Sequence, residues 1–295
     1  MTRTVDDLLV PAGSTGEGDD PVLITPARAR WRYCGLRVLR LAPGVPRRLA
    51  LGEDEAALVP LALPSLDVEV DGARHHLRGR ADAFARVPDY LYVPRDSELE
   101  VVSAEGGTLA VATAHARTRR EAVLLRAEDV AIEVRGAGRA SRQVTNFLTP
   151  DVHVADRLLC CEVLTPPGNW SSHPPHKHDD ATGGVEAELE EIYFFQVDGG
   201  GDGFGAHRTY DLAEGWDVMA TVRTDDAFLV PRGYHGPCMA SPEHALWYLN
   251  VLAGPGAVRS MAISDDPAHA AIRGAWAGQE TDPRVPLATA EGRRA

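Results

Sequence analysis

Short runs of apolar residues recur along the whole chain, and polar turns separate them. Most runs are four to nine residues long, and many alternate apolar and polar positions or are rich in Val, Tyr and Phe. Alternation with a period of two is typical of strands that bury one face. The strands we expect are 33–41, 56–63, 67–70, 90–93, 99–102, 108–113, 131–134, 158–164, 192–197, 216–222, 227–230 and 246–252.

Turn residues and the shortage of helical periodicity decide the predicted fold class. The 28 glycines and 21 prolines are spread along the chain and bound the apolar runs. The best helical candidate, 268–277, is short. Many short strands with regular turns are typical of sandwiches and barrels. We therefore predict an all-β chain with a few short helices.

The length of 295 residues is about twice that of an ordinary domain. A stretch rich in Gly, Arg and Ser at 137–146 lies between strand-like runs near the midpoint. The segments 90–95 and 227–232 also echo one another, since each ends a strand-like run with Val-Pro-Arg. We predict an N-terminal domain at 1–140 and a C-terminal domain with a terminal arm at 141–295.

Charge and cysteine content narrow the class of partner. The chain carries 43 acidic and 30 basic residues, a net charge of −13, which disfavours a nucleic-acid binder or a polybasic membrane anchor. No run approaches the roughly 20 apolar residues of a membrane span, and the amino end lacks the features of a signal peptide. The four cysteines form no Cys-x-x-Cys pair. We expect a cytoplasmic protein with neither nucleic-acid nor membrane partners.

A histidine cluster is the first candidate for chemistry. Three of the 11 histidines, His173, His176 and His178, fall within six residues. In an extended segment His176 and His178 share one face and Lys177, the only lysine of the chain, lies on the other. Two imidazoles on one face can chelate a divalent metal, and a solvent-exposed cluster is the alternative. We expect Lys177 to support the ligands or the fold and not to take part in catalysis.

Two later features favour the metal site. The pair Glu190-Glu191 opens a strand, and the segment 231–235, Pro-Arg-Gly-Tyr-His, ends another strand with a tight turn and a histidine. The combination His-x-His, Glu and Pro-x-Gly-x-His offers three imidazoles and one carboxylate on successive strands. This mixed donor set suits Zn, Mn, Fe, Co or Ni, and affinity order alone does not choose among them. We expect one divalent metal, with Zn or Mn favoured.

These motifs resemble a known family. The run 168–179 (Gly-Asn-Trp-Ser-Ser-His-Pro-Pro-His-Lys-His-Asp), the segment 190–195 and the segment 231–235 resemble the 5-deoxy-glucuronate isomerase family of myo-inositol catabolism. That family is related to the 4-deoxy-5-threo-hexosulose-uronate ketol-isomerases. Further matches at 31–36, 88–94 and 282–286 extend the resemblance over nearly the whole chain.

The resemblance implies two cupin barrels in one chain, with the metal site in the C-terminal barrel. The ligands it implies are His176, His178, Glu191 and His235. Glu191 is selected over Glu190 because the family's ligand stands two residues before the strand tyrosine. The adjacent His75 and His76 of the first half lack a matching Glu and Pro-x-Gly-x-His, so we expect that barrel to be metal-free. His173 stands where the family has tyrosine, which affects the pocket rim only.

The implied reaction is the aldose–ketose interconversion of 5-deoxy-glucuronate and 2-deoxy-5-keto-gluconate. A base would shuttle a proton through an enediol, with a metal-assisted hydride shift as the alternative. The candidates for proton transfer are Glu190, Tyr193, Tyr234 and a metal-bound water. The candidates for binding the substrate carboxylate are Arg142, Arg208, Arg223 and Arg232. Trp170 is a candidate wall of the pocket, with core packing as the alternative.

Two rival functions fit the same motifs. A cupin dioxygenase would hold Fe(II) in a similar ligand set and consume oxygen. A sugar-binding cupin without catalytic activity would bind the ligand without turnover. In each case the expected partner is a small sugar acid, and a homo-oligomer is compatible with the sequence.

Overall fold

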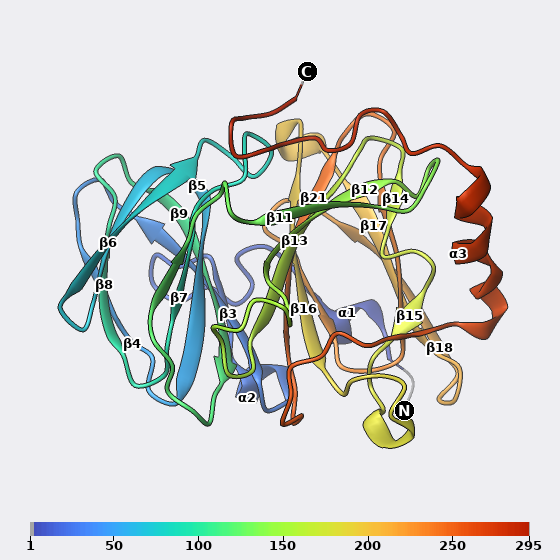
Figure 1. The fold of residues 1–295 in the computed structure, drawn as a ribbon, viewed down its shortest axis with the longest axis horizontal. Coiled ribbons are helices and arrows are strands. Elements are labelled where there is room, and N and C mark those ends of the chain that lie inside the picture. The colour runs from blue at the N-terminus through green and yellow to red at the C-terminus, as the bar shows by residue number, and fades with distance from the viewer. Residues whose placement is uncertain (1–2, 295) are drawn as a thin grey trace.

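The computed structural model describes residues 3–294 and consists mainly of strands (Figure 1). Among these residues the helical segments are short: α1 (Val5–Leu8), α2 (Pro26–Ala29), α3 (Ala271–Ala275), η1 (Ala181–Gly183), η2 (Gly200–Asp202), η3 (Pro267–His269) and η4 (Trp276–Gly278). The prediction of an all-β chain with few short helices is confirmed. None of the described helices has the length and apolar character that a membrane crossing needs.

The first half of the chain forms one strongly bent sheet. Its main pairing path runs through β10 (Val123–Leu125), β7 (Tyr90–Val93), β5 (Asp54–Val70), β9 (Gly107–His115), β3 (Cys34–Leu41) and β2 (Val22–Ile24). Its remaining strands are β4 (Arg47–Ala50), β6 (Ala73–Arg80) and β8 (Glu98–Val102). The long strand β5 pairs with both parts of this sheet, so the sheet folds over on itself around an apolar cluster.

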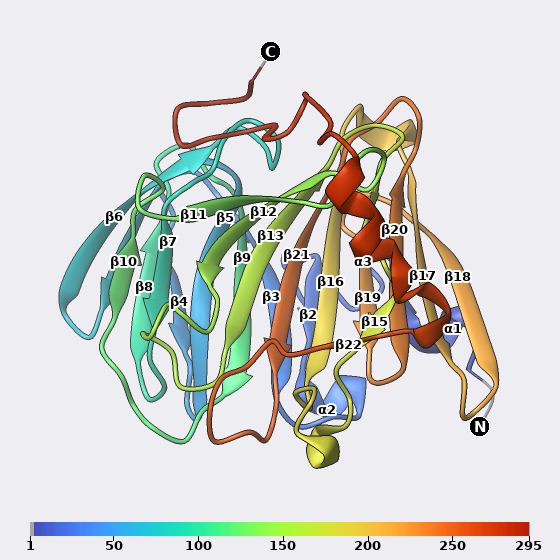
Figure 2. The ribbon, with the colours of Figure 1, turned by 45° about the vertical axis from the view of Figure 1, so that its right-hand side comes forward.

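The second half forms two sheets that face each other as a barrel (Figures 1 and 2). The first sheet consists of β1 (Leu9–Val10), β19 (Ala227–Val230), β16 (Glu190–Val197), β21 (Leu246–Ala253), β13 (Leu159–Thr165), β12 (Arg142–Leu148) and β11 (Ala131–Arg135). The second consists of β18 (Trp216–Val222), β17 (Gly205–Asp211), β20 (Tyr234–Ala240), β15 (His176–Lys177), β22 (Ser264–Asp265) and β14 (Trp170–Ser171).

Burial patterns explain the layering of the second half. β18 alternates strictly between buried and exposed residues, as a strand with one face in water should. All residues of β13 and β21 are buried because the barrel interior covers one face and the first half covers the other. This double coverage explains why 246–253 reads as a nearly continuous apolar run.

The two halves share a core. The largest apolar cluster joins residues of β3 and β9 to residues of β16 and β21. Within this interface the Arg80 guanidinium binds the Glu162 carboxylate at 2.6 and 2.9 Å, and both side chains are almost fully buried. Glu55 accepts hydrogen bonds from the backbone amides of Arg157 and Leu158, both at 2.6 Å. The halves are therefore joined by both apolar and polar contacts.

Strand pairing crosses the predicted domain boundary at residue 140. β1, from the extreme amino end, and β11, which precedes residue 140, pair within the sheet of the second half. A domain boundary is a statement about which segment folds alone, so the division at residue 140 stays a prediction.

Two expected features differ from the structure. The separate strands 56–63 and 67–70 are one strand, β5, whose register shifts between Pro60 and Ala62. Prolines are tolerated at such irregularities, so they do not end the strand. The stretch 137–146 is also not a plain linker, because β12 begins at Arg142. Its polar residues Gln143 and Thr145 are buried, which hides the strand from a hydrophobic pattern.

Candidate metal centre and active site

The candidate ligands come from both facing sheets of the second barrel. His176 in β15 is paired directly with His235 in β20, which places their side chains on the same face. His178 follows β15, and Glu191 is the second residue of β16. The turn before His235 depends on Gly233, which has φ = +84° and leaves only 2.6 Å between an added Cβ and the carbonyl oxygen of Tyr210.

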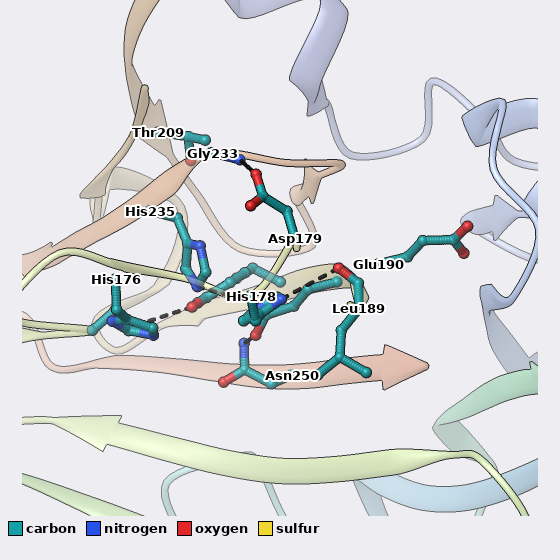
Figure 3. A network of polar contacts seen from close by, with 12 residues as sticks. His176, His178, Asp179, Leu189, Glu190, Thr209, Gly233, His235 and Asn250 are labelled. Atoms are coloured by element: carbon teal, nitrogen blue, oxygen red, sulfur yellow. Dashed lines mark hydrogen bonds and ion pairs between the residues drawn. The ribbon is translucent and has the colours of Figure 1, made fainter. Parts of the chain in front are cut away.

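The ligand atoms converge inside the barrel. The three imidazoles point toward one another (Figure 3). His178 Nε2 lies 2.9 Å from Glu191 Oε2, and His235 Nε2 lies 3.2 Å from the same oxygen. Candidate donor atoms of His178, Glu191 and His235 all lie within 4.8 Å of one another. The His176 ring is adjacent, with its centroid 4.5 Å from that of His235.

The unsatisfied polar atoms of this cluster fit a bound cation. His235 is fully buried; its Nδ1 has no hydrogen-bond partner within residues 3–294, and its Nε2 faces only the Glu191 carboxylate oxygen at 3.2 Å. His178 Nδ1 donates toward the Leu189 carbonyl at 3.3 Å, so in a neutral ring Nε2 is an acceptor that faces the Glu191 carboxylate. Two facing acceptors need a proton or a cation between them. Imidazole and carboxylate donors suit a divalent metal.

The charge states of Glu191 and His176 suit metal binding as well. Burial would raise the pKa of Glu191, but the neighbouring His235 and His178 hold it well below its usual range. Burial, reinforced by the nearby His235, moves the pKa of His176 well below its usual value. An ionised carboxylate and a neutral imidazole are the forms that ligate a metal.

A second layer of contacts holds these side chains in place. Asn250 donates from Nδ2 to Glu191 Oε1 at 2.7 Å, and His176 Nδ1 lies 3.0 Å from the carbonyl oxygen of Pro174. Asp179 accepts from the Gly233 amide at 2.7 Å and from Lys177 Nζ at 2.8 Å. The loop after His178 is thereby tied to the turn before His235.

Glu190 lies outside the cluster. Its carboxylate points away from the histidines (Figure 3) and accepts hydrogen bonds from the backbone amides of Arg32, Tyr33 and Cys34 at 2.6 to 3.0 Å. These contacts join β16 to the start of β3. The structure thus places this candidate for proton transfer at the junction of the two halves.

The two tyrosine candidates lie on opposite sides of the barrel wall. Tyr193 is buried inside, with its ring 6.0 Å from that of His235 and its hydroxyl 3.1 Å from Ser172 Oγ. Burial, together with the nearby Glu191 carboxylate, raises the pKa of Tyr193 well above its usual value. Tyr234 is half-buried and stacks on Tyr210, at the edge of a cavity of about 990 Å³ between the barrel end and the segment 30–33. Tyr193 is therefore the candidate adjacent to the ligands.

The four arginine candidates differ in how their guanidinium groups are engaged. Arg208 forms two hydrogen bonds with Asp217, at 2.9 and 2.7 Å. Arg232 contacts Asp211 at 2.9 Å and Glu214 at 3.2 Å. Arg223 has a long contact of 3.4 Å with the Gly203 carbonyl. Arg142 alone among the four is buried, and it lies against the interior of the second barrel.

Trp170 and His173 form part of the outer edge. Trp170 is 42 % exposed, which argues against core packing, and its ring meets that of His173 edge-on at 5.5 Å. Sequence reasoning did not single out Ser172, Tyr248 or Asn250, which line the interior around the ligands. The one signal for Asn250 was an amide inside the apolar run 246–253.

The barrel topology and the buried His–Glu cluster define a cupin-type protein with a donor set that could hold a metal ion. Residues 8–272 match the family model of the KduI/IolB family. The chain belongs to this family, which confirms the resemblance drawn from the motifs.

Relatives and solved structures agree with this assignment. The chain is 39 % identical over 264 residues to the 5-deoxy-glucuronate isomerase of Geobacillus kaustophilus, covering 89 % of this chain and 94 % of that one. An IolB-like protein from Salmonella typhimurium superposes with a TM-score of 0.83 at 33 % identity, covering 90 % of this chain and 98 % of that chain. The oxalate decarboxylase of Lactobacillus farciminis, at 10 % identity and a TM-score of 0.63 over 88 % of each chain, shares the fold.

Proposed function

We propose that this chain is a metal-dependent aldose–ketose isomerase that converts 5-deoxy-glucuronate to 2-deoxy-5-keto-gluconate in myo-inositol catabolism. The observation that carries the proposal is the buried cluster of His178, Glu191 and His235 in a chain of the KduI/IolB family. The names of the relatives supply the substrate. A cytoplasmic location remains part of this proposal.

Four residues would hold the metal: His176, His178, Glu191 and His235. A divalent cation held by these residues would supply Lewis-acid chemistry, which would acidify the proton on the carbon next to the substrate carbonyl. Asn250 orients Glu191 by holding its second carboxylate oxygen. The neutral His176 keeps its Nε2 lone pair for coordination because Nδ1 is engaged by the Pro174 carbonyl.

Tyr193 is the residue we propose as the hydrogen-bond donor to a substrate oxygen beside the ligands. Its raised pKa keeps the phenol protonated, so it can donate a hydrogen bond to a substrate oxygen. Ser172 Oγ, which lies within 3.1 Å of both Tyr193 Oη and Tyr248 Oη, can relay that proton within the barrel. The carboxylate of Glu190 is held by three backbone amides away from the ligands. Tyr234 lies outside the barrel wall. Neither side chain therefore lies beside the ligand cluster as Tyr193 does.

The proposal is tested by following 5-deoxy-glucuronate by NMR in deuterated water with the metal-replete protein. The expected result is the appearance of the ketose with deuterium at the new hydroxymethyl carbon, as an enediol proton shuttle requires. Ketose without deuterium would support the hydride shift in place of the enediol proton shuttle. Absence of ketose would overturn the isomerase proposal.

Matched variants and one further measurement separate the rivals. His178→Ala should abolish turnover, whereas His153→Ala, at an exposed position, should leave it unchanged. Oxygen uptake with the substrate would instead indicate a cupin dioxygenase. Saturable binding of the sugar acid without turnover would indicate a binding module.

A further inference from the structure

Arg142 is a buried cation without a carboxylate partner. It is 6 % exposed and opens β12, on the same strand face as Val144, which packs inside the second barrel. Its guanidinium donates to the Ala140 carbonyl at 3.2 Å, and no carboxylate within residues 3–294 lies close enough to form an ion pair with it. A buried charge of this kind is costly unless an anion compensates for it.

The surroundings of Arg142 increase that cost. Burial, together with the nearby Arg135 and Arg273, lowers the pKa of Arg142 to about 10, although Tyr248 partly offsets this. The acidic residues nearby are already engaged: Glu133 binds Arg135 at 2.8 Å, and Asp265 binds Arg273. Arg142 is therefore the cation of this region that is left for an external anion.

Hydroxyl groups lie in the barrel interior between Arg142 and the candidate ligands. The side chain of Arg142 acts electrostatically on Tyr248, whose hydroxyl lies 3.0 Å from Ser172 Oγ. Ser172 Oγ lies 3.1 Å from the hydroxyl of Tyr193, and the Tyr193 ring lies next to that of His235. The barrel interior thus has a ligand cluster at one end and a cationic group at the other, with hydroxyl groups between them.

A terminal segment covers the cationic end. The Arg142 and Arg273 guanidinium carbons lie 5.7 and 5.8 Å from the ring centroid of Trp276. Arg273 in α3 binds Asp265, whose strand position is opposite His176. Figure 2 shows α3 passing in front of β20 near β15. The segment from Asp265 to Trp276 therefore spans the side of the barrel between the ligand cluster and Arg142.

We propose that the Arg142 guanidinium binds the carboxylate of the sugar acid and selects a uronate over a neutral aldose, an inference that rests on the proposed function. A uronate carries its reacting carbonyl at one end and its carboxylate at the other, so it can present the carboxylate to a cation other than the metal site. The planar donor fork of arginine suits a carboxylate, and Trp276 excludes water from one side of the pair.

Calorimetry tests this inference without depending on turnover. The probes are 5-deoxy-glucuronate reduced at C1 to the alcohol, which keeps its carboxylate and cannot isomerise, and the neutral alditol with a hydroxymethyl group in its place. The parent protein should bind the carboxylate probe at least about 30-fold more tightly. Arg142→Gln should bind both probes with the same weak affinity, and Arg142→Lys should retain part of the preference.

The controls separate this inference from a folding defect and from the proposed function. Arg74→Gln, at an exposed ion pair, should keep the full preference. Metal content and thermal unfolding of the Arg142 variants show whether the barrel is intact, and retained binding of the neutral probe gives the same information. A preference that survives in Arg142→Gln, or is missing from the parent, would overturn the assignment of Arg142. Failure of the parent to isomerise 5-deoxy-glucuronate would overturn the proposed function alone.

Discussion

The side-chain amide of Asn250 donates to Glu191 Oε1 across 2.7 Å, while His178 Nε2 lies 2.9 Å from the other carboxylate oxygen. The two residues belong to β21 and β16, which are paired in the centre of the seven-stranded sheet. Glu191 is thus held on both oxygens by side chains from different segments. The orientation of this carboxylate is built into the rigid part of the barrel rather than into a loop.

Replacement of Asn250 by Ala should weaken metal binding. The loss of a hydrogen bond to a ligating carboxylate lowers metal affinity by about 10- to 100-fold. Competition with a chromophoric chelator measures this change. Asn146→Ala removes an amide that bonds the exposed Glu133 and is the matched control. If Asn250→Ala and the parent bind the metal with equal affinity, then either Glu191 is not a ligand or Asn250 does not position it.

Replacement of Arg80 by Met should destabilise the whole chain. Arg80 and Glu162 are 1 % and 2 % exposed, and the variant leaves the Glu162 carboxylate buried without its cation. We expect the free energy of unfolding to fall by about 3–5 kcal/mol, measured by denaturant titration. The exposed pair of Arg48 and Glu100 is the control, and Arg48→Met should cost about 0–1 kcal/mol.

A double variant checks the explanation for that loss. Arg80→Met combined with Glu162→Leu removes both charges, so it should recover much of the lost stability. The Trp247 ring lies 5.2 Å from the Arg80 guanidinium carbon. If the double variant stays unstable, the lost packing against Trp247 causes most of the destabilisation.

Lys177 should stabilise the loop that follows His178. Its ammonium group contacts Asp179 at 2.8 Å and also Glu186, which is almost fully buried. Lys177→Met should lower the free energy of unfolding by about 1–3 kcal/mol and speed amide exchange in the segment 179–186. Lys177→Arg keeps the positive charge, so its free energy of unfolding should fall less than that of Lys177→Met. Unchanged exchange in both variants would contradict a structural role for this lysine.

His207 should make stability depend on pH. Its ring is buried between Cys238 Sγ at 2.8 Å and Thr209 Oγ1 at 3.0 Å. Burial, assisted by the nearby His235, lowers the pKa of His207 to about 3, whereas a histidine in the unfolded chain titrates near about 6.5. Below pH 6.5 the unfolded state therefore binds more protons, and the stability due to His207 falls as the pH is lowered toward 3.

The expected slope for this one group is up to about 1.4 kcal/mol per pH unit. His207→Gln should flatten the pH dependence of the unfolding free energy between pH 6 and 4 by about that amount, measured by urea titration. His153→Gln controls for the loss of an exposed histidine. Parallel curves for His207→Gln and the parent would show that His207 is not held neutral in the folded state.

The fold was predictable where burial follows the strand period. The alternating segment 216–222 and the continuous run 246–252 both correspond to strands. β12 could not be found in this way because Arg142, Gln143 and Thr145 interrupt the apolar pattern. These residues are buried because of partners that lie far away in the sequence, such as Ala288 for Gln143.

In the candidate site, too, local features could be predicted from the sequence and long-range contacts could not. The spacing of His176 and His178 is local, so the strand period predicts that both rings share a face, and the pairing of β15 with β20 brings that face to His235. The hydrogen-bond partners of the Glu190 carboxylate could not be predicted from the sequence, because Arg32, Tyr33 and Cys34 stand more than 150 positions earlier. The choice of Arg142 among four arginines likewise depends on the folded chain, in which Arg208 and Arg232 meet carboxylates and Arg142 alone is buried.

Turnover measured against bound metal tests the role of the His–Glu cluster most directly. The protein is stripped with a chelator and refilled in steps, and the metal per chain and the rate of ketose formation from 5-deoxy-glucuronate are recorded for each sample. We expect the rate to rise linearly with bound metal, up to one ion per chain, and to be absent in the stripped protein. The same rate in stripped and refilled protein would contradict a metal-dependent isomerase.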